Sequence, residues 1–132
     1  MNRLVTVARA VGFCGVLAII LLSLVPGPDR PHTGLPGEAE HFAAYCLTGL
    51  AFAPAVRPLA FRIALVVGLT LLAGAMEVLQ HFVPGRHPAA ADAIASSLGA
   101  LTGIALGGLL FGLAALAYHK HRRFSETPGP VR

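Results

Sequence analysis

Charged side chains are scarce in this chain of 132 residues: they make up 12% of it, whereas 55% of the residues are hydrophobic. In soluble domains about a quarter of the residues are charged, so the composition excludes an ordinary water-soluble fold and favours lipid as the solvent. A helix that crosses the hydrocarbon core of a membrane needs about 20 apolar residues. The chain therefore has room for four or five spans at most, and for no separate soluble domain.

Cysteine and the common catalytic motifs are sparse as well. The two cysteines, Cys14 and Cys46, lie inside apolar runs, where an isolated cysteine usually behaves as a small hydrophobic residue, so neither a disulfide framework nor a redox site is indicated. The chain lacks the HExxH and CxxC spacings of zinc sites and the GxSxG turn of hydrolases. The net charge of +4 comes from basic residues at segment ends rather than on one polar face, which argues against nucleic acid as a partner.

Four apolar runs, separated by short segments rich in proline and glycine, predict an all-α, integral membrane four-helix bundle. The first run is too long for the apolar part of a signal peptide and ends at Pro26-Gly27-Pro28 without a cleavage pattern, so we interpret it as a helix. One domain is expected over residues 1–118, followed by a basic, disordered cytoplasmic tail over residues 119–132. The expected helices are 5–25, 36–55, 59–82 and 89–118.

Lysine and arginine are distributed unequally between the two sides of this bundle. Only Arg30 and Arg86 fall in the segments that follow the first and third helices. The opposite side carries Arg3, Arg9, Arg57, Arg62, Lys120, Arg122, Arg123 and Arg132. By the positive-inside rule, the side with more basic residues, which holds both termini, is the cytoplasmic one.

Glycines recur at every fourth position of the last helix, at Gly99, Gly103 and Gly107. Small residues at this spacing let two helix backbones approach closely in lipid. The stripe therefore predicts a packing face. We favour packing against another helix of the same bundle, and a homodimer through this face is the alternative.

Nearly all polar residues that are unfavourable in a membrane lie within two or three helical turns of the predicted outer surface. Glu77 lies about 10 Å below the end of its helix, at 1.5 Å per residue, and a spacing of three places Gln80 on the same face. Since three helices each carry polar residues at this level, they predict one pocket, with Arg86 above it. The candidate ligand-binding residues are Glu40, His41, Tyr45, Glu77, Gln80, Arg86, Asp92 and Ser96.

Several of these residues also have a purely structural interpretation. A carboxylate in lipid is costly, so Glu77 is expected to face the bundle and to pair with Arg86, His41 or another donor. Glu40 and Asp92 lie near helix starts, where the positive end of the helix dipole favours a negative charge.

A metal site is the main chemical alternative for this cluster. Glu77, His81, His41 and Asp92 offer nitrogen and oxygen ligands, yet no helix carries a paired-histidine zinc motif. We interpret His81, like His87, as an interfacial residue. We therefore expect neither a metal ion nor another cofactor.

Four strings of residues occur in an order and at spacings that resemble those of the VanZ-like family of bacterial membrane proteins. The strings are Ser23-Leu24-Val25-Pro26, Glu40-His41-Phe42-x-x-Tyr45, Glu77-x-x-Gln80-x-Phe82-x-Pro84-Gly85-Arg86 and Asp92-x-x-x-Ser96-x-x-Gly99-x-x-x-Gly103. The chain departs from the family pattern at Ser96, where the family usually has asparagine, and at Gly37-Glu38, where an Asp-Lys pair is common. The resemblance implies a helical bundle in the bacterial cytoplasmic membrane and a link to glycopeptide (teicoplanin) resistance.

These observations favour a binding or shielding role over catalysis. The outer pocket is expected to bind a lipid-linked or amphiphilic molecule of the cell envelope, with Arg86 pairing with its phosphate or carboxylate. One alternative is an enzyme that acts on an envelope lipid, with Glu77 or His41 as the general base and Arg86 stabilising negative charge. The other is a structural or accessory membrane subunit in which the polar cluster only fixes the helix register.

Overall fold

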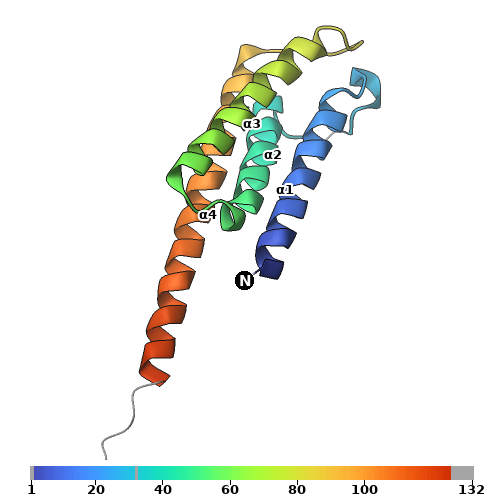
Figure 1. The fold of residues 1–132 in the computed structure, drawn as a ribbon. Coiled ribbons are helices and arrows are strands. Elements are labelled where there is room, and N and C mark those ends of the chain that lie inside the picture. The colour runs from blue at the N-terminus through green and yellow to red at the C-terminus, as the bar shows by residue number, and fades with distance from the viewer. Residues whose placement is uncertain (1, 32, 126–132) are drawn as a thin grey trace, which may run out of the picture.

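The computed structural model describes residues 2–31 and 33–125, and these residues form four α-helices and no strand. Two short 3-10 turns, η1 (Gly27–Asp29) and η2 (Ala53–Ala55), follow the first and second helices. The all-α prediction is therefore confirmed for the part of the chain described. The helices in Figure 1 are α1 (Asn2–Ser23), α2 (Gly37–Phe52), α3 (Leu59–Gln80) and α4 (Ala90–Ser125).

Three of the helices are long and apolar enough to cross a membrane. The candidate spans are Arg3–Ser23, Leu59–Gln80 and Ala90–Arg122. Large apolar side chains such as Leu71, at 68% exposed, cover the outward faces of these helices, and such a surface is stable in contact with lipid rather than water. With only 16 residues, α2 is too short to be counted among these spans.

Consecutive helices run in opposite directions, so the connections alternate between the two ends of the bundle (Figure 1). Residues 24–36 and 81–89 lie at one end, which we call the polar end. The two connections touch there: the Gly27 N–H donates to the Pro84 carbonyl at 3.0 Å. A Cβ at Gly27 would lie 2.1 Å from the Gly85 carbonyl oxygen, and Gly85 has a φ of +72°, a conformation that glycine adopts without steric cost. This contact joins the end of α1 to the α3–α4 turn.

The glycine stripe of α4 packs against α2 of the same chain. A Cβ added at Gly99 would lie 2.3 Å from the Phe42 carbonyl oxygen, and one at Gly103 would lie 2.0 Å from that of Cys46. The helices therefore approach backbone to backbone, as the small-residue spacing predicts. Bundle packing is the alternative that the geometry supports, because α2 covers the face that a homodimer would need.

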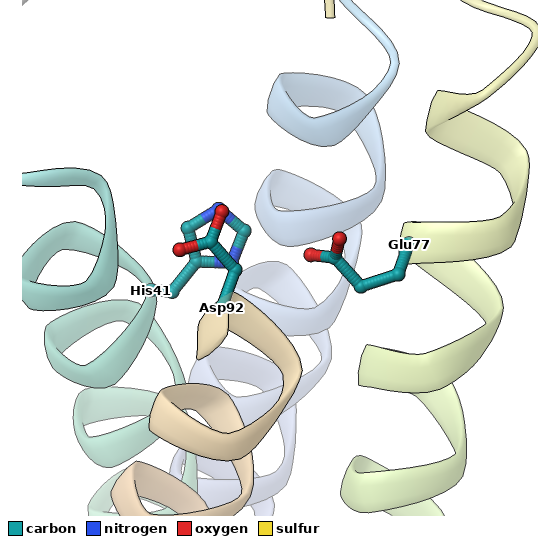
Figure 2. Close-up of side chains that lie close together, drawn as sticks. All are labelled: His41, Glu77 and Asp92. Carbon is teal, nitrogen blue, oxygen red and sulfur yellow. The ribbon is translucent and has the colours of Figure 1, made fainter. Parts of the chain in front are cut away.

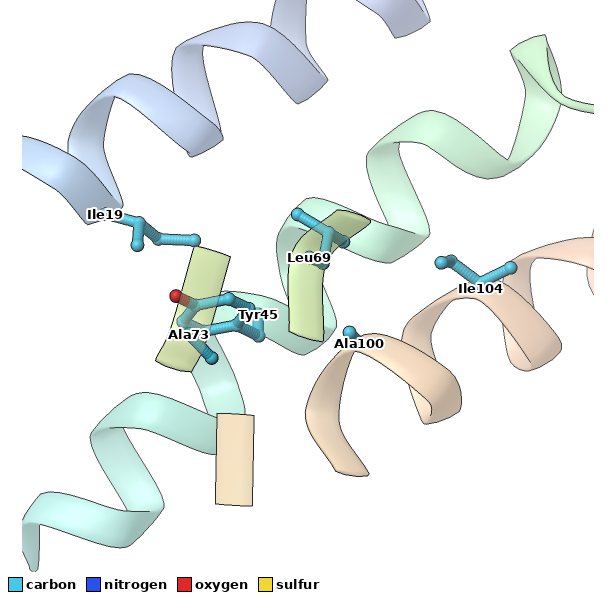
Figure 3. Packing of buried hydrophobic residues seen from close by; sticks show 6 residues of the cluster. All are labelled: Ile19, Tyr45, Leu69, Ala73, Ala100 and Ile104. Carbon is cyan, nitrogen blue, oxygen red and sulfur yellow. The ribbon is translucent and has the colours of Figure 1, made fainter. Parts of the chain in front are cut away.

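A small apolar core forms where all four helices meet (Figure 3). Tyr45 of α2 is only 2% exposed and lies among side chains of α1, α3 and α4. Within lipid such contacts stabilise the bundle mainly through close packing, because lipid tails are as apolar as the side chains themselves. The buried cluster consists of Ile19, Tyr45, Leu69, Ala73, Ala100 and Ile104.

Some predicted helix ends differ from the observed ones. The prediction of a disordered tail is wrong for residues 119–125, because α4 continues to Ser125. That segment contains neither proline nor glycine, and its basic residues are favoured near a helix C-terminus by the helix dipole. The rest of the predicted tail lies outside the described residues. In addition, α2 ends at Phe52 rather than at residue 55, because Pro54 has no N–H to continue the helix and a 3-10 turn replaces it.

Candidate functional site

Three side chains from three helices converge at the polar end of the bundle. His41 lies in the second turn of α2, Glu77 in the last turn of α3 and Asp92 in the first turn of α4 (Figure 2). One ligand-type atom of each residue lies within 4.8 Å of the other two. We call these residues the carboxylate–histidine trio. The α3–α4 turn is short enough to bring both carboxylates to one level, and the close contact of α2 with α4 adds the imidazole.

The imidazole ring of His41 is held from both sides by residues of α4. Its Nδ1 lies 3.3 Å from the hydroxyl oxygen of Ser96, and its Nε2 lies 4.0 Å from a carboxylate oxygen of Asp92. In the tautomer with its proton on Nδ1, His41 donates to Ser96 and presents the Nε2 lone pair to the trio, whereas in the other tautomer Nδ1 accepts from the Ser96 hydroxyl. Ser96, at 1% exposed, therefore positions His41 and does not face an open cavity.

Glu77 is bound by a backbone donor rather than by a basic side chain. One of its carboxylate oxygens accepts a hydrogen bond of 2.9 Å from the Ala89 N–H, immediately before α4. This contact satisfies an unpaired donor near the helix start, where the dipole also favours a negative charge. Glu77 faces the bundle as predicted, at 9% exposed, and its donor is the backbone N–H of Ala89 instead of the guanidinium of Arg86.

Arg86 binds the C-terminal end of α1. Its Nε donates to the Val25 carbonyl at 3.0 Å, and another guanidinium N–H donates to the Leu22 carbonyl. Carbonyls at a helix end have no partner within the helix, so the side chain caps α1. Burial and, secondarily, the charge of Arg30 lower the pKa of Arg86 from its ordinary value. Both acceptors are neutral, and the acidic side chains whose charges act favourably on Arg86 are Glu77 and Asp92.

Arg30 belongs to the same site, although the sequence pattern marks it only as an exception to the charge bias. Its guanidinium forms an ion pair with Glu40 of α2, and the Thr33 hydroxyl donates to the other carboxylate oxygen of Glu40. One feature of the sequence could have indicated its role: Arg30 is one of only two basic residues on the predicted outer side, which is rich in acidic residues. Glu40 is therefore a partner of the loop rather than a free helix-dipole charge.

Two cavities open beside these residues. The larger, of about 460 Å³, lies between α1 and α2, with apolar walls and with Arg30, Glu40 and Arg86 among the residues at its polar end. The smaller, of about 220 Å³, is lined by both arginines and by His41 and Asp92 of the trio. Arg30, His41 and Arg86 line both cavities.

The remaining predicted ligand-binding residues are buried. Tyr45 is part of the apolar core and also lines the larger cavity. Gln80 is 3% exposed, lines the smaller cavity and donates to the Ser23 carbonyl at 3.3 Å. Tyr45 thus connects the wall of the larger cavity to the core, and Gln80 connects the wall of the smaller cavity to the end of α1.

Known proteins give no match to this chain, whether it is compared with models of protein families, with curated proteins or with solved structures. The functional interpretation therefore depends on the residues and the geometry described above.

Proposed function

We propose that this chain is a bacterial cytoplasmic-membrane protein that binds an amphiphilic molecule of the cell envelope. The anionic headgroup lies against the arginines of the polar end, and the apolar tail lies along the groove between α1 and α2. The observation that carries this proposal is the larger cavity, because it combines a long apolar wall with a cationic end.

The shape and charge of the larger cavity match an amphiphile in three respects. Ala18 and Ile19 of α1 and Leu47 of α2 contribute to a wall that an acyl or prenyl chain can contact. Arg86 donates its described hydrogen bonds to neutral backbone carbonyls, and arginine binds phosphate and carboxylate groups in a bidentate manner. The groove runs along a helix whose outward face suits lipid, so a lipid-linked molecule can enter from the membrane.

The proposal includes the topology and the family. We infer four spans with both termini in the cytoplasm, on the basis of the charge bias, and membership of the VanZ-like family, on the basis of the motifs. At 1.5 Å per residue α2 is about 24 Å long, shorter than the hydrocarbon core. A helix shorter than the hydrocarbon core is accommodated at modest cost when the bilayer thins locally. The polar end then faces the outside, and a role in glycopeptide resistance belongs to the same proposal.

The tail contact is tested by filling the groove. We expect Ala18→Trp to lower the affinity of the purified protein for fluorescent phosphatidylglycerol about tenfold, because the indole occupies the space of the tail. Ala10→Trp is the matched control, since Ala10 is also exposed on α1 and does not line the cavity. Equal binding by both variants and the wild type would refute the groove.

The headgroup contact is tested with the same assay. We expect Arg86→Gln to reduce the preference for phosphatidylglycerol over phosphatidylcholine about tenfold, the effect of one lost charge-assisted hydrogen bond. Arg9→Gln, an exposed arginine of α1 outside both cavities, serves as the control. An unchanged lipid preference in a folded Arg86→Gln protein would exclude an anionic headgroup at this position.

An enzyme acting on an envelope lipid is the second candidate, and the observation that favours it is the carboxylate–histidine trio beside the smaller cavity. In that case Glu77 or His41 acts as the general base, and Arg86 stabilises the developing negative charge. Product formation from labelled envelope lipids, abolished by Glu77→Gln, would favour this candidate, whereas binding without turnover favours the first.

A further inference from the structure

We propose that His41, Glu77 and Asp92 bind a divalent metal ion, and that its chemistry is that of zinc. The three side chains come from three different helices, and their ligand atoms lie within 4.8 Å of one another (Figure 2). Imidazole nitrogens and carboxylate oxygens are both zinc ligands, at about 2.0–2.2 Å. This assignment does not depend on amphiphile binding, because Glu77 and Asp92, the two carboxylates of the trio, do not line the groove between α1 and α2.

The first argument is electrostatic. Two carboxylates, Glu77 and Asp92, face each other inside a bundle whose outer surface is apolar. Like charges at this separation repel strongly where little water screens them, unless a cation lies between them. Among the described interactions, the nearby guanidinium of Arg86 is bonded to backbone carbonyls and that of Arg30 to Glu40. The charge of Arg86 acts on both carboxylates, but no described ion pair joins it to either one, so a metal ion at the centre of the trio supplies a positive charge in direct contact with them.

The second argument is that two of the ligands are held by further contacts that leave their ligand atoms available. Ser96 engages Nδ1 of His41, and in the tautomer that carries its proton on Nδ1 the Nε2 lone pair faces the trio. The Ala89 N–H engages one carboxylate oxygen of Glu77 and leaves the other for the ion. Metal-binding histidines and carboxylates are generally oriented by such outer partners.

The third argument concerns the open side of the site. The smaller cavity, of about 220 Å³, is lined by His41 and Asp92 and has room for water. Three protein ligands with a water-filled fourth position are typical of zinc sites that react with a substrate, whereas structural sites are closed by four. The open position also faces Arg30 and Arg86, so an anion can approach the ion there.

The present separations are wider than those around a bound ion. Ligand atoms in a tetrahedral zinc site lie about 3.4 Å apart, so the separations within the trio, which are at most 4.8 Å, have to shorten by no more than about 1.4 Å. The side-chain torsions of Glu77 and Asp92 allow this movement without a change in the helices. An imidazole ligand favours zinc over magnesium and calcium, which prefer oxygen alone.

The test measures Zn²⁺ itself on the purified full chain in detergent. After removal of metal with a chelator, we expect wild type to bind one Zn²⁺ per chain with a dissociation constant below about 1 μM, measured by competition with a chromophoric chelator. Co²⁺ in place of Zn²⁺ should give the visible absorption of a four- or five-coordinate ion. Failure of the wild-type chain to bind stoichiometric Zn²⁺ overturns the proposal, whatever the variants do.

Substitutions at single residues inside and outside the trio locate the ion. We expect Glu77→Gln and Asp92→Asn each to weaken Zn²⁺ binding at least 100-fold, whereas Glu38→Gln and His119→Ala leave it unchanged. Glu38 and His119 are exposed and lie outside the trio, so they report adventitious binding. If the controls lose as much affinity as the trio variants, the bound zinc is elsewhere and the assignment is wrong. Tighter binding of Mn²⁺ than of Zn²⁺ would overturn the choice of zinc.

Discussion

The backbone contact between α2 and α4 makes a strong prediction about a single methyl group. In Gly103→Ala the new Cβ would lie 2.0 Å from the Cys46 carbonyl oxygen, whereas ordinary contacts begin at 3.4 Å. The neighbour is a helix backbone and cannot rotate away, so the two helices have to separate by about 1.4 Å. We expect this substitution to lower the free energy of unfolding and to pull Asp92 away from His41.

The magnitude follows from a comparison within the same helix. Overpacking of a tight interface costs about 1–3 kcal/mol, and a backbone neighbour places Gly103→Ala at the upper end of that range. Gly112→Ala is the matched control, because a Cβ there meets nothing within 4 Å. Both substitutions share the intrinsic gain of about 1 kcal/mol when alanine replaces glycine in a helix. The difference between the two variants therefore isolates the helix contact, and we expect it to be about 3 kcal/mol.

Equilibrium unfolding in mixed micelles, followed by circular dichroism as the fraction of denaturing detergent rises, measures this difference. The expected order of stability is Gly112→Ala, then wild type, then Gly103→Ala. Free energies of unfolding that agree within about 0.5 kcal/mol for the two variants would refute the close contact of α2 with α4.

Three further predictions concern the polar end. Arg86→Ala should lower the free energy of unfolding by about 1.5–3 kcal/mol, because two backbone carbonyls at the end of α1 lose a charged donor, and unfolding in mixed micelles measures the loss. Ser96→Ala should weaken Zn²⁺ binding about tenfold by releasing the imidazole, whereas Ser97→Ala, whose hydroxyl bonds within its own helix, should not; equal affinities would contradict the positioning role. In a chain without its native cysteines, Asp29→Cys should react with a membrane-impermeant maleimide added to intact cells and Arg57→Cys only after lysis, and the reverse pattern would invert the topology.

The level of the candidate site along the helices was predictable from the sequence, whereas its hydrogen-bond partners were not. Spacings of three and four residues place Glu77 with Gln80, and Asp92 with Ser96, on single helix faces. These spacings are local, so they survive any arrangement of the helices. Which group donates to Glu77 depends on how the α3–α4 turn folds back. In the structure that turn brings the backbone N–H of Ala89 within hydrogen-bond distance of the carboxylate.

The ion pair between Arg30 and Glu40 is a second contact that the sequence pattern could not predict. Arg30 follows the 3-10 turn η1 and is ten residues from Glu40 in the sequence, and no helical periodicity relates two such positions. The contact arises because the first connection folds over the start of α2. Contacts between a connecting segment and a helix can therefore be identified only from the tertiary structure.

The sequence by itself determined the class of this protein. Its apolar runs, its proline and glycine breaks and the glycine stripe of α4 specify helices, their approximate ends and a close packing face, because these depend on composition and on the period of the helix. Only the tertiary structure decided that α2 covers this stripe, that Arg86 caps α1, and that His41, Glu77 and Asp92 meet. Those outcomes depend on the relative positions of separate helices, which no local pattern in the chain encodes.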